Sequence, residues 1–187
     1  MQHSALLVRI VKKKLWNLEK SHSIISMKKG GNIMSKNLEG NASPDFDLPV
    51  TGGGKLSKED LKGKKYVLFF YPKDNTPGWQ AEASEFRDQY NDIKSLGYEV
   101  YGISKDGMKS HESFKEKNQL PFELISDKDK VLHEAYDVLK EKNMFGKKVM
   151  GTDRSTFIID EKGIVVKEFR GVKSKGHVAD VLEYLKG

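Results

Sequence analysis

The stretch from Tyr66 to Tyr90 constrains the fold more than any other part of this 187-residue chain. It opens with six apolar residues at 66–71, mostly aromatic or β-branched, a pattern typical of a strand buried on both faces. The next residues, 72–78, include two prolines and a glycine and predict a loop. From Gln80 to Tyr90 the apolar side chains recur every three or four residues, which predicts a helix. Such a helix presents unpaired N–H groups at its first turn, where an anion is stabilised.

The rest of the body predicts alternating strands and helices. A short edge strand around Phe46 and Leu48, a glycine turn at 51–55 and a capped helical turn opening at 57–60 come before the buried strand. After the central helix we expect strand 98–104, helix 108–117, strand 122–126, helix 130–139, a basic loop at 142–151, strands 154–160 and 164–169, and helix 177–185. This order predicts an α/β fold, a three-layer domain with a mixed central sheet and helices on both faces.

Three histidines and one apolar pair have no clear functional pattern. His111, His133 and His177 lack the spacing of metal ligands, so we interpret them as surface or helix-face residues. Met144 and Phe145 are interpreted as core residues rather than as a dimer contact. The chain has no cysteine, which excludes disulfides and thiolate metal sites. We therefore expect no metal site.

The net charge of +6 belongs to the first 33 residues. They carry seven basic residues against the single acidic Glu19, so the remaining body is balanced. A balanced body gives no electrostatic reason to expect nucleic-acid binding. No apolar run reaches the roughly 18–20 residues that a membrane span needs. We therefore expect one cytoplasmic domain over 34–187, with neither a nucleic-acid nor a membrane partner.

The head, residues 1–33, has three interpretations. Its basic, acid-poor composition resembles an organellar transit peptide, and its apolar spacing also allows an amphipathic surface helix. Residues 29–34 can be encoded by a purine-rich ribosome-binding sequence followed by a start codon. We favour this last interpretation, in which the natural protein begins at Met34 and the head is leader sequence, disordered or loosely attached. An N-terminal peptide from upstream of Met34, found by mass spectrometry of the native protein, would contradict it.

Residues 69–78, Phe-Phe-Tyr-Pro-Lys-Asp-Asn-Thr-Pro-Gly, resemble the active-site approach of the peroxiredoxins, specifically the Q-type or bacterioferritin-comigratory class. The family motif Pro-x-x-x-Thr-x-x-Cys-x-x-Glu falls on Pro72, Thr76, Trp79 and Glu82. The resemblance implies a thioredoxin-like fold. It covers the body from Ser43 to Leu185 and includes further similar segments in the family's order, at 86–88, 142–148, 154–160 and 176–178.

The resemblance implies an antioxidant enzyme that reduces hydrogen peroxide and organic hydroperoxides. In the family, a thiolate attacks the terminal peroxide oxygen and becomes a sulfenic acid. A resolving thiol, with thioredoxin or a small thiol as reductant, then restores it. The chemistry needs no cofactor, and the family contains both monomers and homodimers.

The resemblance also assigns roles to individual positions. Thr76 would hydrogen-bond both the nucleophile and the attacked oxygen, and Pro72 would shield the nucleophile. Arg154 would keep the nucleophile ionised and polarise the O–O bond as a fixed positive charge. Glu82 would orient Arg154 or the neighbouring backbone. The nucleophile itself belongs at position 79, on the first turn of the helix.

The sequence departs from the family at its centre, where Trp79 replaces the nucleophile and Ser84 occupies the usual resolving position. An indole has no ionisable nucleophile, and its bulk would fill the peroxide pocket. Three explanations remain open. Position 79 is a selenocysteine codon, UGA, written as tryptophan, so that Ser84 leaves one nucleophile that needs an external reductant. Alternatively, a cysteine has been replaced, or the protein is a catalytically inactive relative that binds a partner, for instance through the basic segment 142–148.

Overall fold

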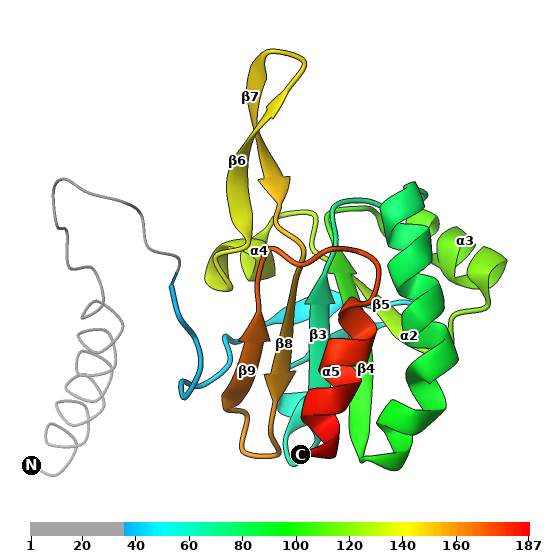
Figure 1. Cartoon of the computed structure of the whole chain (residues 1–187), viewed down its shortest axis with the longest axis vertical. Coiled ribbons are helices and arrows are strands. Elements are labelled where there is room, and N and C mark those ends of the chain that lie inside the picture. Colours follow the sequence, from blue (N-terminus) through cyan, green and yellow to red (C-terminus); the bar gives the residue numbers. More distant parts are fainter. Residues whose placement is uncertain (1–35) are drawn as a thin grey trace, which may run out of the picture. The chain divides into compact units, whose positions relative to one another are not determined.

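The computed structural model describes residues 36–187, and the basic head with the expected start at Met34 lies outside this part of the chain (Figure 1). At the centre of the described part is a five-stranded sheet with the strand order β5-β4-β3-β8-β9. The first three strands of this order are parallel, whereas β8 and β9 are antiparallel to their neighbours. The strands are β3 (Lys65–Phe70), β4 (Tyr98–Ser104), β5 (Glu123–Ser126), β8 (Ser155–Ile159) and β9 (Val165–Phe169).

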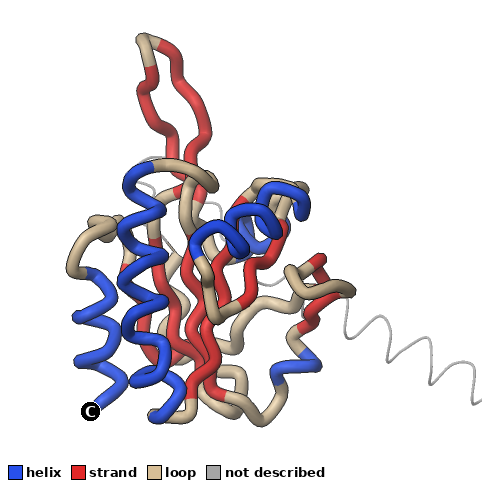
Figure 2. The backbone as a smooth tube through the Cα atoms, turned by 90° about the vertical axis from the view of Figure 1, so that its right-hand side faces the viewer, coloured by secondary structure: helices blue, strands red, loops and turns tan. Residues whose placement is uncertain are grey.

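Alternating side chains of β3 build one core on each face of the sheet. Val67 and Phe69 join a cluster with α2, α3 and α5, whereas Leu68 and Phe70 join a second cluster with α4 and η1. Helices therefore cover both faces, with α2 beside α5 (Figure 2), and the predicted three-layer architecture is confirmed. No helix within 36–187 is long and apolar enough to cross a membrane. The helices are α2 (Pro77–Ser95), α3 (Met108–Asn118), α4 (Val131–Ala135), α5 (His177–Lys186) and the 3₁₀ helix η1 (Glu59–Leu61).

A small hairpin precedes the sheet, as the sequence predicts. β1 (Asp47–Pro49) and β2 (Lys55–Ser57) pair antiparallel around the glycine turn. The chain then enters η1 through a reciprocal cap. The Ser57 N–H donates to the Asp60 carboxylate at 2.8 Å, and the Asp60 N–H donates to Ser57 Oγ at 3.3 Å. This arrangement is the capping box expected from the sequence.

Two helices, α2 and α4, differ from their predicted bounds by more than one residue. α2 begins at Pro77 rather than at Gln80, because proline is favoured in a first helical turn and Thr76 adopts the extended conformation of an N-cap. α4 is only five residues long, although the sequence predicts a helix over 130–139. The chain leaves the helical path at Asp137, whose φ of 52° is left-handed, and the residues that follow form a strand.

The prediction of a basic loop over 142–151 is wrong, because these residues belong to a β-hairpin separate from the main sheet (Figure 1). Its strands, β6 (Leu139–Met144) and β7 (Lys147–Thr152), pair antiparallel. Phe145 and Gly146 form the turn with φ of 52° and 77°, both positive as a type I′ turn requires. The first four residues of β7 are exposed, so no apolar alternation marks this strand. Phe145 is fully exposed, which contradicts its expected place in the core.

Gly102 in β4 leaves room for core side chains. A Cβ added there would lie 2.7 Å from Phe69 Cζ and 2.8 Å from Leu124 Cδ2, well inside carbon–carbon contact distance. We expect Gly102→Ala to lower the free energy of unfolding by about 1–3 kcal/mol, measured by urea denaturation. Gly151→Ala is the matched control, because a Cβ there would meet only the flexible Lys142 side chain; its loss should stay within about 0.5 kcal/mol. Equal losses in the two variants would contradict the packing argument.

Candidate active site

The candidate site lies where β3 ends and α2 begins. Residues 71–76 connect the two elements, and the first backbone hydrogen bond of the helix runs from the Gln80 N–H to the Thr76 carbonyl at 3.0 Å. The N–H groups of Gly78 and Trp79 precede this bond and therefore have no carbonyl of an earlier helical turn to pair with. Together with the helix dipole, they favour a negative charge at the first turn of α2.

Trp79 lies on this first turn, as predicted, and its indole is completely buried. The ring stacks on Tyr71 with 3.7 Å between centroids and an interplanar angle of 7°. Phe69 and Phe114 complete its surroundings at 5.2 and 5.5 Å. The indole Nε1 is buried without a hydrogen-bond partner, although a buried tryptophan N–H usually has one. The indole thus fits the core by shape but leaves its polar group unsatisfied.

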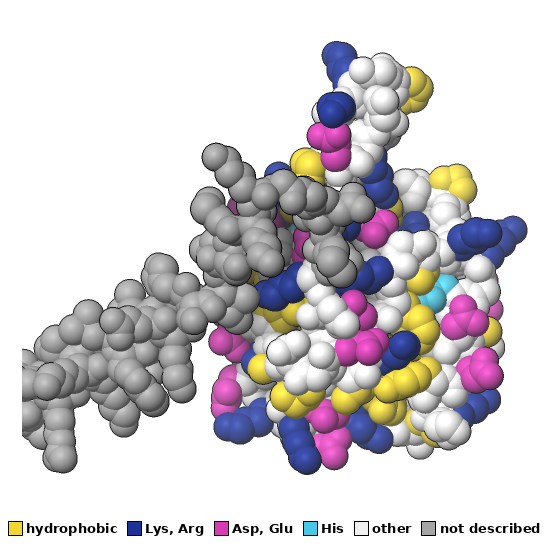
Figure 3. Space-filling model, turned by 60° about the vertical axis from the view of Figure 1, so that its left-hand side comes forward, with side chains coloured by type: hydrophobic (Ala, Val, Ile, Leu, Met, Phe, Trp, Pro, Cys, Tyr) yellow, Lys and Arg dark blue, Asp and Glu magenta, His cyan; other side chains and the backbone are white. Residues whose placement is uncertain are grey.

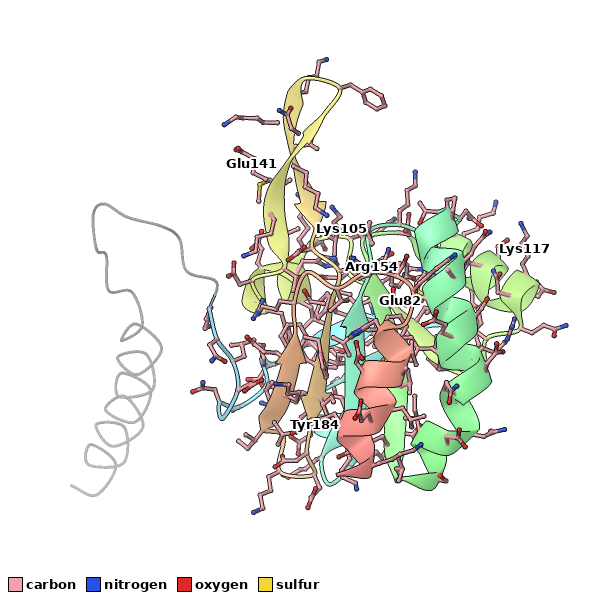
Figure 4. All side chains as sticks on the ribbon, in the orientation of Figure 1. Glu82, Lys105, Lys117, Glu141, Arg154 and Tyr184 are labelled. Atoms are coloured by element: carbon pink, nitrogen blue, oxygen red, sulfur yellow. The ribbon has the colours of Figure 1, made fainter. Side chains whose placement is uncertain are left out.

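Arg154 and Glu82 form a buried ion pair beside the same turn (Figure 4). Arg154 lies between β7 and β8, immediately before β8, and its Nη1 donates to Glu82 Oε2. The Glu82 side chain is fully buried, and that of Arg154 is 13% exposed. A Cβ built on Gly78 would lie 3.4 Å from Arg154 Nη2, so the guanidinium lies against the first turn of α2. Glu82 is therefore in place to orient Arg154 there.

The other predicted site residues lie on the connecting loop and on α2. Thr76 Oγ1 donates to the Lys73 carbonyl at 3.1 Å, which leaves its oxygen lone pairs available to accept a hydrogen bond. Pro72 is half-buried on the same loop, and Ser84 is half-buried on α2. The loop thus brings Thr76 and Pro72 to the end of the sheet from which α2 starts.

Asp74, which the sequence pattern does not mark as a site residue, holds this loop in place. Its carboxylate accepts hydrogen bonds from Tyr71 Oη at 2.8 Å, Ser110 Oγ at 2.6 Å and His111 Nδ1 at 2.9 Å. Its own N–H donates to Asp106 Oδ2 at 2.7 Å. Burial alone would raise the pKa of Asp74, but the hydrogen bonds from His111 and Ser110 outweigh it and lower the pKa. An ionised Asp74 therefore ties the loop to α3.

His111 is a buried partner of this loop rather than a surface residue, which corrects the sequence interpretation. Its Nδ1 faces the Asp74 carboxylate and its Nε2 faces the Ile125 carbonyl at 3.2 Å. The imidazole therefore lies between the loop carboxylate and the backbone of β5. Because Tyr71 bonds to the same carboxylate and stacks on Trp79, the network reaches the ring at position 79. A histidine and an acid 37 residues apart gave no local sequence signal of this pairing.

The other two histidines lie on helices, as one of the two sequence interpretations has it, but they are buried rather than at the surface. His133 Nδ1 bonds to Asp127 Oδ2 at 2.6 Å, at the start of α4. His177 Nε2 bonds to Thr156 Oγ1 at 2.7 Å, and burial lowers its pKa to about 4. Within 36–187, no group of three histidine or acidic side chains is arranged to hold a metal ion.

Glu82 and His177 should impose opposite pH dependences on stability. Burial raises the pKa of Glu82 from 4.5 to about 7, although Arg154 partly counteracts it. The folded protein therefore holds this proton more tightly, and the contribution of Glu82 to stability falls as the pH rises from 4.5 to 7. The pKa of His177 falls from 6.5 to about 4, so its contribution rises with pH across that window.

We therefore expect the free energy of unfolding of Glu82→Gln, relative to that of the parent, to rise by roughly 3 kcal/mol as the pH increases from 4.5 to 7. For His177→Gln, the free energy of unfolding relative to that of the parent should fall by roughly 3 kcal/mol as the pH increases from 4 to 6.5. Urea denaturation at several pH values measures both differences. If the free energy of unfolding of each variant changes with pH in the same way as that of the parent, the two pKa shifts are contradicted.

Comparison with known proteins assigns the chain to a family. The model of the AhpC/TSA family matches residues 40–168, which is most of the chain. The chain belongs to the AhpC/TSA family. Among curated members, a Coxiella burnetii protein assigned to the bcp peroxiredoxins is 51% identical over 143 residues, covering 76% of this chain and 95% of that protein. Peroxiredoxin Bcp of Bacillus subtilis is 47% identical over 147 residues, covering 79% and 94%.

The solved structures that resemble this chain include Q-type peroxiredoxins and bacterioferritin comigratory proteins. A cysteine-to-serine variant of Xylella fastidiosa PrxQ matches with a TM-score of 0.74 and 37% identity, covering 84% of this chain and 98% of that one. The bacterioferritin comigratory protein of Xanthomonas campestris, described for its alkyl peroxide reduction, matches with a TM-score of 0.72 and 41% identity, covering 75% and 90%. The resemblance to Q-type peroxiredoxins and the thioredoxin-like fold are thus confirmed.

Proposed function

We propose that this peroxiredoxin reduces hydrogen peroxide and organic hydroperoxides through a nucleophile at position 79. The observation that carries the proposal is the ion pair between Arg154 and the buried Glu82, which holds a cation against the first turn of α2. Position 79 lies on that turn, where the unpaired N–H groups add to the positive potential. The Xanthomonas campestris relative described for alkyl peroxide reduction supports the substrate class.

The proposed reaction proceeds by displacement at oxygen. An ionised thiol or selenol at position 79 attacks the terminal peroxide oxygen, the O–O bond breaks, and the alkoxide leaves as an alcohol after taking a proton. The nucleophile becomes a sulfenic or selenenic acid, and two electrons from a dithiol restore it with release of water. Arg154 stabilises the nucleophile and the developing alkoxide, and Glu82 orients Arg154. Thr76 positions the peroxide, and Pro72 shields the nucleophile.

We also propose that position 79 carries selenocysteine or cysteine in the working enzyme, with a recoded UGA as the favoured origin of the written tryptophan. The buried indole N–H without a partner supports this, because leaving such a group unsatisfied costs about 1–3 kcal/mol. Sequencing the codon and determining the mass of the native peptide test the proposal. A UGG codon with tryptophan in the native protein, and no peroxide consumption by that protein, would contradict it.

The proposed electron donor is a thioredoxin-type protein or a small thiol. Such donors are kept reduced in the cytoplasm, where we place the enzyme. The balanced charge of the body supports a role without nucleic acid or membrane partners, as a monomer or homodimer. Native protein purified from its source should consume hydrogen peroxide in the presence of dithiothreitol, whereas recombinant protein with Trp79 should not.

A further inference from the structure

We propose that the β6–β7 hairpin is the docking surface for the reducing protein, with Phe145 as its apolar anchor. This inference rests on the proposed function, because it names the partner of the same site. The chain contains no cysteine and thus no second thiol to resolve an oxidised residue 79. The electrons must therefore come from an external thiol, and a protein donor, one of the two proposed, needs a surface at this end of the sheet.

Phe145 is placed for contact with another molecule. It is 101% exposed at the turn of the hairpin, so its ring packs against nothing in the described structure. Its φ of 52° is unusual for a bulky residue, since asparagine, aspartate or glycine normally occupies this position of a type I′ turn. Both the exposure and the conformation are unfavourable in the isolated chain. Val149 and Met150, 38% and 54% exposed, are further exposed apolar residues of β7, one on each face of the hairpin because they are adjacent in the strand.

The charge of the hairpin indicates an acidic partner. The hairpin carries Lys140, Lys142, Lys147 and Lys148 against the single Glu141, and Lys140 pairs with Asp137 at its base at 3.2 Å. Figure 3 shows basic and hydrophobic side chains together on this projection. Lys148 pairs with Glu141 at 2.9 Å. Lys147 has no acidic partner among the residues described. Residues 34–187 as a whole are balanced in charge, so a second copy offers less complementarity than an acidic protein does.

The hairpin also lies at the end of the sheet that carries the candidate active site. Only Asp153 separates the end of β7 from Arg154, and the Asp153 N–H donates to the Val138 carbonyl at 2.7 Å to fix the base of the hairpin. In Figures 1 and 4 the hairpin projects from the end at which β3 finishes and α2 begins. Lys105 is labelled near its base, where burial and the nearby Lys130 and Lys142 lower its pKa. A protein seated on the hairpin would therefore approach the end of the sheet that carries the nucleophile position.

Binding to a reduced thioredoxin of low isoelectric point tests the proposal without turnover. ¹⁵N-labelled thioredoxin is titrated with the chain as its sequence stands, and we expect shifts around the dithiol that saturate. Phe145→Asn keeps a residue favoured in the turn but removes the ring, and should raise the dissociation constant about tenfold. Lys147→Glu with Lys148→Glu should weaken binding and reduce its dependence on salt. Tyr184→Gln, which removes a 40% exposed aromatic at the opposite end of the sheet, should leave binding unchanged.

Several outcomes would overturn the inference. No saturable binding by the parent, or equal dissociation constants for the parent and Phe145→Asn, would do so. So would a dimer that Phe145→Asn dissociates in sedimentation while thioredoxin binding is unchanged, because the occupant would then be a second copy. Failure of the proposed function looks different: Trp79→Cys would consume no peroxide with any reductant, while thioredoxin binding and its dependence on Phe145 persist.

Discussion

Trp79→Cys should lower the free energy of unfolding by about 3–5 kcal/mol and should give the chain a peroxide-reactive thiol. The loss of stability follows from the complete burial of the indole and from its stack on Tyr71, since a cysteine leaves most of that volume empty. Removing the unpaired Nε1 offsets part of this decrease in the free energy of unfolding. A small reactive side chain at a core position therefore exchanges stability for function. Urea denaturation measures the change.

Trp79→Phe is the matched control. It keeps an aromatic ring against Tyr71 and removes the unpaired N–H, so we expect it to lose less than half as much stability as Trp79→Cys. Neither variant changes the Arg154–Glu82 pair. If Trp79→Cys unfolds at the same urea concentration as the parent, the indole does not contribute the packing that the structure shows.

Arg154→Met should destabilise the fold by about 3–5 kcal/mol at pH 8. The change leaves the carboxylate of Glu82 fully buried without its cation. The pKa of Glu82 is already raised to about 7 by burial, and loss of Arg154 raises it further. At pH 5 the carboxyl group is neutral in the folded variant, so the cost should be smaller there. Urea denaturation at the two pH values measures this difference.

Two further variants check that the effect belongs to the buried pair. Arg154→Met combined with Glu82→Leu should recover much of the lost stability, because no buried charge remains. Lys94→Met breaks the exposed pair with Glu99 and should cost less than about 1 kcal/mol at either pH. A loss for Arg154→Met that is the same at pH 5 and pH 8 would contradict an uncompensated Glu82.

The sequence predicted elements that are buried against the sheet. The apolar run at 66–71 became β3 because both of its faces contact a core. β6 and β7 were missed for the opposite reason, since a largely solvent-exposed hairpin carries no apolar period, and its turn uses Phe145 instead of the usual asparagine or glycine. The end of α4 was missed because a left-handed Asp137 has no distinct signal in a single sequence.

Some residues of the candidate site could likewise be predicted from the sequence, whereas others depend on contacts between distant segments. Local motif positions such as Thr76 and Glu82 could be named from the sequence, because the motif keeps them within one loop and one helix. Asp74 lies in that same loop, but its role depends on His111 in α3, 37 residues away. The complete burial of Trp79 was also unforeseen, because it results from Phe69, Tyr71 and Phe114 meeting in three dimensions.

The central claim is that Arg154, held by Glu82, activates a nucleophile at position 79. The direct measurement is the rate constant for oxidation of the thiol in Trp79→Cys by hydrogen peroxide, compared with Trp79→Cys combined with Arg154→Met or Arg154→Lys. Both double variants are first checked for folding by circular dichroism. We predict that loss of the arginine slows oxidation by about 10²–10³-fold, with lysine intermediate. Equal rate constants in the folded single and double variants would contradict the claim.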